Sequence, residues 1–495
     1  MINALLWLPL AAGLLAFVTP LRAVRTVPVL GALAALVLAI VLVLDFDPGV
    51  AGLQHAVDES WIPDLGVRYE LGIDGISVFL VLLTTMLWAA ATLYSAFNPP
   101  ERPRTYFFML GVAETGALGA FLAQDLLLFV LFFDLMLVPF YFLIGAWGGE
   151  DRIRATMKMM VYTLVGSLLM LVGAIATAVI AADGGEISFS LADLGANVLD
   201  EGSQDWIFWF FAAAFLVKMP AFLVHGWMPD AYRAAPIAVV AVLSGVLSKV
   251  GAYGFLRVAL PLYPDAAVQF QDFLLVIAVA GIVYGGAMAF TQANVRLVAG
   301  FSSLAQLGFI TLGIFSLRPD GADGAVLQMV NHGLVVAPTF FIIGVLAARA
   351  GTEDLREMGG LAFRAPILAA LFLIVTLATL AMPGSANFIG EFYILVGAFQ
   401  SKVTYAIIAT IGVAFAAFYA IRLYQRTMHN RLPEGIESRE ITWREGLVIA
   451  PLVACIVALA LYPGLILERG ERSVESALGQ TEVSSQQTAD SRAQR

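Results

Sequence analysis

The chain is dominated by apolar runs about as long as the hydrocarbon core of a bilayer is thick. A helix crosses that core with about 20 apolar residues, and residues 27–44 contain no charged side chain at all. Of the 495 residues, 60% are hydrophobic and 13% are charged, which is more apolar surface than one soluble core could bury. The sequence therefore predicts an all-α polytopic membrane protein with about fourteen transmembrane helices.

Charge, cysteine content and the length of the apolar runs exclude four other classes of protein. A formal net charge of −10 argues against a nucleic-acid-binding protein. The single cysteine, Cys455, excludes a disulfide-rich scaffold and an iron–sulfur protein. The apolar runs are also much longer than the alternating segments of about ten residues that build an outer-membrane β-barrel.

Hydrophobic periodicity and turn residues set the expected boundaries of the spans. The predicted transmembrane helices are about 3–18, 27–44, 74–97, 105–122, 126–147, 157–182, 206–227, 236–260, 270–291, 296–316, 324–349, 366–400, 404–424 and 446–467.

The loops between these spans sort by charge into two alternating sets. The acidic set comprises residues 45–74, 183–205 and 265–272. The basic set contains Arg22, Arg25, Arg102, Arg104, Arg152, Arg154, Lys158, Arg233, Arg296, Arg349, Arg356, Arg364, Arg426, Arg431, Arg439 and Arg444. The positive-inside rule places the basic set in the cytoplasm. Both termini are then expected on the outer face, as an even number of spans requires.

No linker divides the chain, so we expect one membrane domain over residues 1–469. Residues 470–495 are rich in Ser, Gln, Thr and Ala and lack apolar periodicity. Such a composition is typical of a disordered tail, and this is what we predict for that segment.

Two spans carry a proline near the middle of the membrane, Pro220 in span seven and Pro383 in span twelve. Proline removes a helical hydrogen bond and breaks the helix. The two breaks lie five spans apart, and an odd offset reverses direction through the membrane. Residues 105–260 (spans four to eight) and 270–424 (spans nine to thirteen) can therefore form two inverted five-helix repeats, and paired broken helices point to a transport site. Kinks that serve packing alone are the alternative.

Several ionisable side chains lie inside the predicted helices, where each costs about 2.5–3.5 kcal/mol to insert. Glu114, Asp134, Lys218, Lys249, His332 and Glu391 share roughly one depth. His225 lies near the cytoplasmic end of span seven, where it either gates water or caps a turn.

Buried lysines and acids at one depth suit a proton relay. Burial favours the neutral form of a lysine, and a nearby acid restores the charged form. We predict that Asp134 lies beside Lys218 and that moving the acid away releases the lysine proton. Static ion pairs that lock helices together are the alternative. For Glu114 the alternative is a hydrogen bond to a hydroxyl across a helix.

The motifs around these charges resemble a known family. The segments KMPAFLVHGWMPDAYRAAP (218–236), LSKVGAYGFLR (247–257) and PGSANFIGEF (383–392) are similar to those of the antiporter-like membrane subunits of NADH–quinone oxidoreductase, respiratory complex I. The resemblance covers nearly the whole chain. Within the family, glutamate at the position of Glu391 indicates the subunit M (chain 4) branch, whereas subunits L and N carry lysine there.

The resemblance implies a role for each residue. Asp134 matches the acid that pairs with the lysine at 218, Lys249 the connecting lysine, His332 a histidine of the central axis and Glu391 the exit residue. Three positions depart from the pattern. Asp134 is one methylene shorter than the usual glutamate. Gln306 stands where many members have histidine and can only orient water, and Tyr232 replaces a second histidine.

The family implies a proton-translocating subunit in the bacterial plasma membrane that moves protons outward. The chain itself lacks a dinucleotide-binding fingerprint, so we expect no cofactor and no metal in it. NADH, FMN, iron–sulfur clusters and quinone are expected in partner subunits. The implied partners are subunits L and N, the peripheral redox arm and lipids. A multi-subunit Na⁺/H⁺ antiporter, a proton-pumping hydrogenase and a purely structural scaffold remain alternatives.

Overall fold

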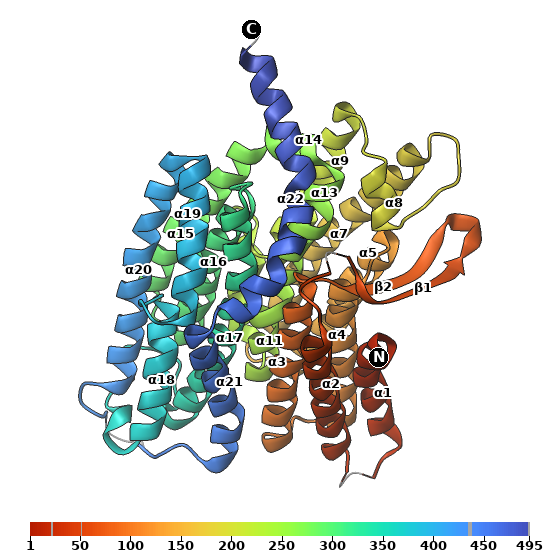
Figure 1. Ribbon diagram of the computed structural model, residues 1–495. Helices are drawn as coiled ribbons and strands as arrows, with labels where there is room; N and C mark the ends of the chain where they lie inside the picture. The colour runs from red at the N-terminus through yellow and green to blue at the C-terminus, as the bar shows by residue number, and fades with distance from the viewer. Residues whose placement is uncertain (21–22, 51, 434–437, 494–495) are drawn as a thin grey trace.

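The computed structural model describes residues 1–20, 23–50, 52–433 and 438–493. It is a bundle of long helices with a short hairpin projecting from one side (Figure 1). Arg22, one of the predicted cytoplasmic arginines, lies outside the described residues. In lipid a backbone can satisfy its hydrogen bonds only within itself, and this is why the apolar runs fold as helices.

The helices follow the predicted spans closely. Residues 1–262 contain α1 (Ile2–Val18), α2 (Thr26–Asp45), α3 (Ser77–Phe97), α4 (Pro103–Leu122), α5 (Leu126–Leu135), α6 (Leu137–Trp147), α7 (Arg152–Ala182), α8 (Leu191–Ala196), α9 (Glu201–Lys218), α10 (Met228–Ala234), α11 (Ile237–Val242), α12 (Ser248–Gly254) and α13 (Leu260–Leu262). The remainder contains α14 (Pro264–Gln269), α15 (Gln271–Thr291), α16 (Val295–Ile314), α17 (Pro319–Ala350), α18 (Pro366–Thr379), α19 (Ala386–Ser401), α20 (Val403–Met428), α21 (Trp443–Leu461) and α22 (Gly464–Ala493).

Within the described residues, eleven helices are long and apolar enough to cross a membrane by themselves. The polytopic all-α class is therefore confirmed. The shorter helices α1 and α18 are also apolar. The count of fourteen spans and the inverted repeats stay predictions.

Both prolines that predicted broken spans lie at helix ends. Helix α9 ends at Lys218, two residues before Pro220, and the chain resumes with a 3₁₀ turn at His225–Trp227. Helices α18 and α19 are separated by residues 380–385, where Ala381 and Gly384 have positive φ angles of 51° and 91°. Only glycine adopts such a conformation without strain, so Gly384 suits this turn.

Two further interruptions were not expected. Span five is divided into α5 and α6 at Met136. Span eight is continuous from Ile237 to Leu262, but it contains π-helical turns at Leu243–Leu247 and Phe255–Ala259. Such turns leave a carbonyl outside the regular helical pattern and are frequent at functional sites.

The acidic loop 45–74 is not plain coil. Strands β1 (Gln54–Ile62) and β2 (Val67–Ile73) pair antiparallel around a 3₁₀ turn at Pro63–Leu65. Sequence reasoning missed this hairpin because the alternation of apolar residues in β1 is weak, and its side chains are largely exposed.

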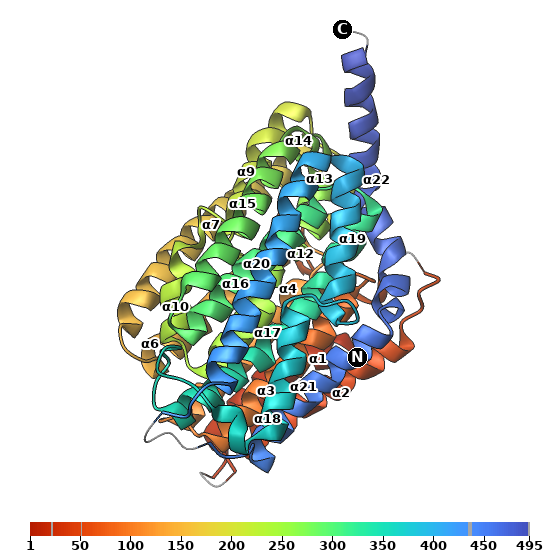
Figure 2. The same cartoon turned by 90° about the vertical axis from the view of Figure 1, so that its left-hand side faces the viewer.

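The tail was expected to be disordered, but residues 470–493 belong to helix α22 (Gly464–Ala493). Its first part packs against α13, α14 and α17, and its C-terminal end projects beyond the bundle (Figures 1 and 2). Ile466, Val474 and Leu478 are fully buried. A narrow apolar stripe on an otherwise polar helix was enough, because the bundle supplies the surface that it covers.

Candidate functional site

Lys218 is the last residue of α9 and is 6% exposed. Its Nζ donates a hydrogen bond of 3.0 Å to the backbone carbonyl of Phe133 and lies 4.3 Å from the centre of the Phe133 ring. Phe133 is in the last turn of α5, where carbonyls lack helical donors. The break between α5 and α6 therefore leaves the Phe133 carbonyl free to accept a hydrogen bond from the Lys218 ammonium group.

Asp134, the next residue of α5, is only half-buried, and its carboxyl group hydrogen-bonds Ser167 of α7. The ion pairs between described residues do not include Lys218 with Asp134. Their charges still act on one another. The predicted pair thus consists of two neighbours that are each held by another group, rather than a direct salt bridge.

Lys249 lies on α12 between the two π-helical turns and is fully buried. Its Nζ donates to the Ser244 carbonyl at 2.6 Å and contacts the Ser248 hydroxyl at 3.3 Å. Ser244 belongs to the first π-helical turn. As at Lys218, an irregular stretch of helix offers a carbonyl to a buried lysine.

His332 faces this lysine from α17. The positive charge of Lys249 acts on the imidazole, and Nδ1 of His332 has no hydrogen-bond partner among the described residues. The helices approach closely here, since a Cβ on Gly333 would lie 2.7 Å from the Gly245 carbonyl. Two glycines therefore let α17 bring His332 toward span eight.

Glu391 lies on α19, five residues after the helix begins, and is 3% exposed. Gln306 Nε2 donates to its Oε1 at 2.7 Å, and Gln328 Nε2 donates to Gln306 Oε1 at 2.6 Å. The two amides form a chain whose donors all point toward the carboxylate. Gln306 thus contacts the acid directly, which is a closer role than orienting water.

Two predicted residues stand apart from this set. Glu114 is buried in α4, and its Oε1 has no hydrogen-bond partner among the described residues. His225 lies on the 3₁₀ turn after the break, with its ring 5.1 Å from that of Tyr284. It is close enough to Lys158 to feel its charge, and Lys158 pairs with Asp230 at 2.8 Å.

Tyr232, which replaces a histidine of the family pattern, is buried on α10. Its hydroxyl hydrogen-bonds the side chain of Ser244. Ser244 also shares a hydrogen bond of 3.1 Å with Ser303. Hydroxyl groups therefore surround the residue whose carbonyl holds Lys249.

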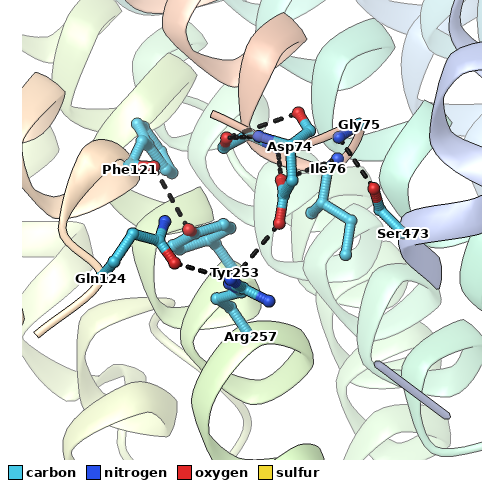
Figure 3. A network of polar contacts seen from close by, with 9 residues as sticks. Asp74, Gly75, Ile76, Phe121, Gln124, Tyr253, Arg257 and Ser473 are labelled. Carbon is cyan, nitrogen blue, oxygen red and sulfur yellow. Dashed lines mark hydrogen bonds and ion pairs between the residues drawn. The ribbon is translucent and has the colours of Figure 1, made fainter. Parts of the chain in front are cut away.

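A separate polar cluster lies near the C-terminal end of span eight (Figure 3). Arg257 Nε lies 3.5 Å from Asp74 Oδ2, and Arg257 Nη2 donates to Gln124 Oε1 at 2.6 Å. Asp74 Oδ1 accepts the backbone N–H groups of Ile76 and Ser77 at 3.0 and 2.8 Å. The cluster joins α3 to span eight.

Helix α22 covers the same cluster. The N–H of Gly75 donates to Ser473 Oγ at 2.9 Å (Figure 3). A cavity of about 240 Å³ opens beside Asp74 and Arg257 and is also lined by Glu70. Burial raises the pKa of the Glu70 carboxyl group. Asp74 and Arg257 form an ion pair of 3.5 Å in which Arg257 Nε has no hydrogen-bond partner among the described residues, and this pair connects the segment before α3 to span eight.

Sequence reasoning missed the uncharged partners Ser167, Ser244, Ser248 and Gln328. One signal was present for Gln328, which precedes His332 by four residues and so lies on the same face of its helix. The serines carry no such signal, because small hydroxyl residues are common in packed membrane helices.

The arrangement has the chemistry of a proton path. Lys218 and Lys249 donate to backbone carbonyls. Asp134 hydrogen-bonds a hydroxyl group, and Glu391 accepts from the Gln306 amide. Each of these partners is neutral, so a change of protonation breaks hydrogen bonds but separates no tight salt bridge. A metal or redox group is not needed for such transfers.

Comparison with known proteins gives a consistent result. Residues 123–416 match the family model described as NADH:quinone oxidoreductase/Mrp antiporter, TM. The chain is 38% identical over 457 residues to the NADH-quinone oxidoreductase subunit M of Rhodobacter capsulatus, covering 90% of this chain and 89% of that one.

Solved structures agree in fold. A chain of respiratory complex I from Thermus thermophilus superposes with a TM-score of 0.89 at 30% identity, covering 97% of this chain and 99% of that chain. A chain of the Mrp complex from Dietzia superposes with a TM-score of 0.82 at 20% identity, covering 97% and 99%. The second likeness concerns the fold alone.

Proposed function

The chain belongs to the NADH:quinone oxidoreductase/Mrp antiporter family, and on that premise we propose that it is the subunit M-type membrane subunit of a bacterial NADH–quinone oxidoreductase. In this role it translocates protons outward and performs no redox chemistry itself. The high identity to subunit M relatives along most of the chain supports the assignment.

One observation carries the proton-translocating role. Lys218 and Lys249 are both buried, and both donate to backbone carbonyls at irregular helix segments. A purely structural lysine would be stabilised by a direct acid partner, since an unpaired buried charge is costly. Lysines held by neutral groups can lose and regain a proton at a smaller cost.

The proposed cycle begins at Lys218. When Asp134 leaves Ser167 and approaches Lys218, the carboxylate stabilises the charged amine. When Asp134 returns to Ser167, the Lys218 ammonium group transfers its proton to Lys249, deeper in the protein, and becomes a neutral amine. His332 then links Lys249 to Glu391. Expelling one charge against 150–200 mV costs about 3.5–4.6 kcal/mol, and a close ion pair at an effective dielectric of 20 is worth about 4 kcal/mol.

The energy for this cycle comes from partners. We assign NADH, FMN, iron–sulfur clusters and quinone to other subunits, and we place subunits L and N beside this chain in the membrane. The basic loops face the cytoplasm and both termini face outward, as the charge bias indicates. Residues 105–260 and 270–424 act as the two inverted halves.

A multi-subunit Na⁺/H⁺ antiporter is the second candidate, favoured by the fold shared with the Mrp complex. A proton-pumping hydrogenase is a weaker one, since the same lysines would serve it. Purification of the native complex decides among them. We expect NADH-oxidising subunits to co-purify and NADH to drive proton uptake into inside-out vesicles. Sodium–proton exchange without NADH, or a nickel–iron partner, would contradict the proposal.

A further inference from the structure

A narrow cavity lies within the second repeat, between α16, α17, α18 and α20. Its volume is about 30 Å³, which is room for about two water molecules. Polar groups are spread along its wall, among them Ser302, Gln306, His332, Thr339, Asn387 and Tyr419. None of the mechanism described so far uses this space.

The cavity lies on one side of the broken span. The lining residues of α18, Phe372, Thr376 and Thr379, all precede the break. Among the described residues, α19 contributes only Asn387, at its second position. Helix α18 begins at Pro366, directly after the basic loop that carries Arg364. The cavity therefore occupies the half of the membrane that faces the basic loops.

The wall that α16 contributes leads in the same direction. It runs from Val298, near the start of the helix beside Arg296, to Gln306. Eight residues of α helix span about 12 Å. The α16 residues that line the cavity thus span from close to the basic face to the depth at which Glu391 is held, while the space itself holds about two water molecules.

Buried polar atoms without partners indicate water in this space. Both amide atoms of Asn387 and Nδ1 of His332 are buried and have no hydrogen-bond partner among the described residues. Buried polar groups in proteins are nearly always satisfied, by ordered water where the protein offers no partner. These two side chains line the cavity, so water within it would satisfy them.

The inner end of the cavity reaches Glu391 through Gln306. Gln306 lines the cavity and donates to Glu391 Oε1 at 2.7 Å. Tyr419 hydrogen-bonds Gln306 and accepts a hydrogen bond of 2.9 Å from Ser302. The carboxylate is thus one side chain away from the water-sized space.

We infer that this cavity is a cytoplasmic water intake that loads Glu391 with protons, independently of the path that begins at Lys218. The inference rests on the proposed function, and it adds an inlet to a residue that the resemblance treats as an exit. Gln306 lies between the cavity and Glu391 and does not titrate, so its amide must rotate aside before water can reach the carboxylate. A hydronium ion in the cavity then transfers its proton to the Glu391 carboxylate, which leaves water and a neutral carboxyl group.

The test measures from which side a thiol in the cavity wall is reached. Cys455 is the only cysteine of the chain, so Cys455→Ser provides a background for single cysteines. Thr339→Cys, in the assembled complex, places a thiol in the wall. Silver ions, which bind thiolates strongly, are applied in nitrate buffer to inside-out and right-side-out membrane vesicles. Bound silver protects the thiol from alkylation after denaturation, and peptide mass spectrometry quantifies that protection.

We expect Thr339→Cys to be protected in inside-out vesicles, whose cytoplasmic face is exposed, and to stay unprotected in right-side-out vesicles. Ala337→Cys is the matched control, because Ala337 is fully buried on the same helix and does not line the cavity. Protection only from the outer side, or reactivity as low as that of Ala337→Cys, would overturn the inference. Ser302→Cys repeats the test if Thr339→Cys does not assemble. The readout does not depend on pumping, so a complex that fails to pump would contradict the proposed function and leave this result intact.

Discussion

Lys218 of α9 donates its hydrogen bond to the carbonyl of Phe133 in α5 at 3.0 Å, although Asp134 directly follows Phe133 in that helix. The carboxyl group of Asp134 is turned to Ser167. An acid and a base that sequence reasoning pairs are therefore held apart by neutral partners. Membrane helices allow this because a break in a helix frees carbonyls that can solvate an ammonium group.

Replacing Lys218 tests whether the buried amine carries protons. In Lys218→Ala we expect NADH oxidation to continue in an assembled complex while NADH-driven proton uptake falls to the level of passive leak. Lys402→Ala is the matched control, because Lys402 is exposed and pairs with Asp272 at 3.1 Å. Its pumping should equal that of the wild type. Normal pumping by Lys218→Ala would exclude the relay role.

Proton uptake should depend more on the negative charge of the Asp134 side chain than on its length. Asp134→Asn keeps a partner for Ser167 but removes the negative charge that stabilises the ammonium form of Lys218, so proton uptake should drop strongly. Asp134→Glu should retain most of it. Proton uptake per NADH oxidised in reconstituted vesicles is the measurement, and an asparagine variant that pumps as well as the wild type would rule out the predicted partnership.

Glu391→Gln keeps the shape of the side chain and the contact with Gln306 but cannot bind and release a proton. We expect normal assembly, continued NADH oxidation and reduced proton uptake. Glu186→Gln, in an exposed loop, should behave as the wild type. The idea fails if both variants pump alike, and loss of assembly in Glu391→Gln alone would indicate a structural role instead.

Gln306→Leu should destabilise the packing of α16, α17 and α19. It leaves Glu391 Oε1 and Gln328 Nε2 without the hydrogen bonds of 2.7 and 2.6 Å that now satisfy them. An unsatisfied buried polar group costs about 1–3 kcal/mol, so thermal unfolding of the purified complex should shift downward. Gln400→Leu removes an exposed amide that bonds Asp320, and its effect should stay within about 0.5 kcal/mol. Equal shifts in the unfolding temperature of the two variants would show that the hydrogen bonds of Gln306 do not stabilise the protein more than an exposed amide does.

Gly75→Ala should loosen α22 from the bundle. A Cβ at this position would collide with the Arg469 carbonyl of α22 and come within 2.9 Å of its carbon atom. Overpacking of this kind costs about 1–3 kcal/mol. Trypsin added to right-side-out vesicles should cleave after Arg469 or Arg472 faster than in the wild type. Gly52→Ala, which has open space around it, is the control and should show the wild-type rate.

Much of the fold was predictable because a bilayer leaves few choices. Apolar runs of the right length must become helices, and the ends of α2, α3, α15 and α16 fall within a few residues of the predicted ones. The hairpin β1–β2 and the helical tail were not predictable in the same way. Both are polar segments whose structure depends on the surface of the bundle that they contact.

The candidate site likewise has a part that was predictable from sequence and a part that was not. Its ionisable members were visible because a charge inside an apolar run stands out. The neutral groups that hold them were invisible, since Ser167, Ser244 and the Phe133 carbonyl acquire meaning only when another helix or a helix break lies beside them.

The sequence by itself determined that this protein is a membrane bundle with buried lysines and acids at one depth, because the cost of placing charge in hydrocarbon makes every such residue conspicuous. Only the tertiary structure decided which group each charge touches. Helix breaks and π-helical turns expose carbonyls at particular points in space, and close packing at Gly245 and Gly333 sets which helices meet there. Whether Lys218 rests on an acid or on a carbonyl depends on that packing, which no pattern along the chain encodes.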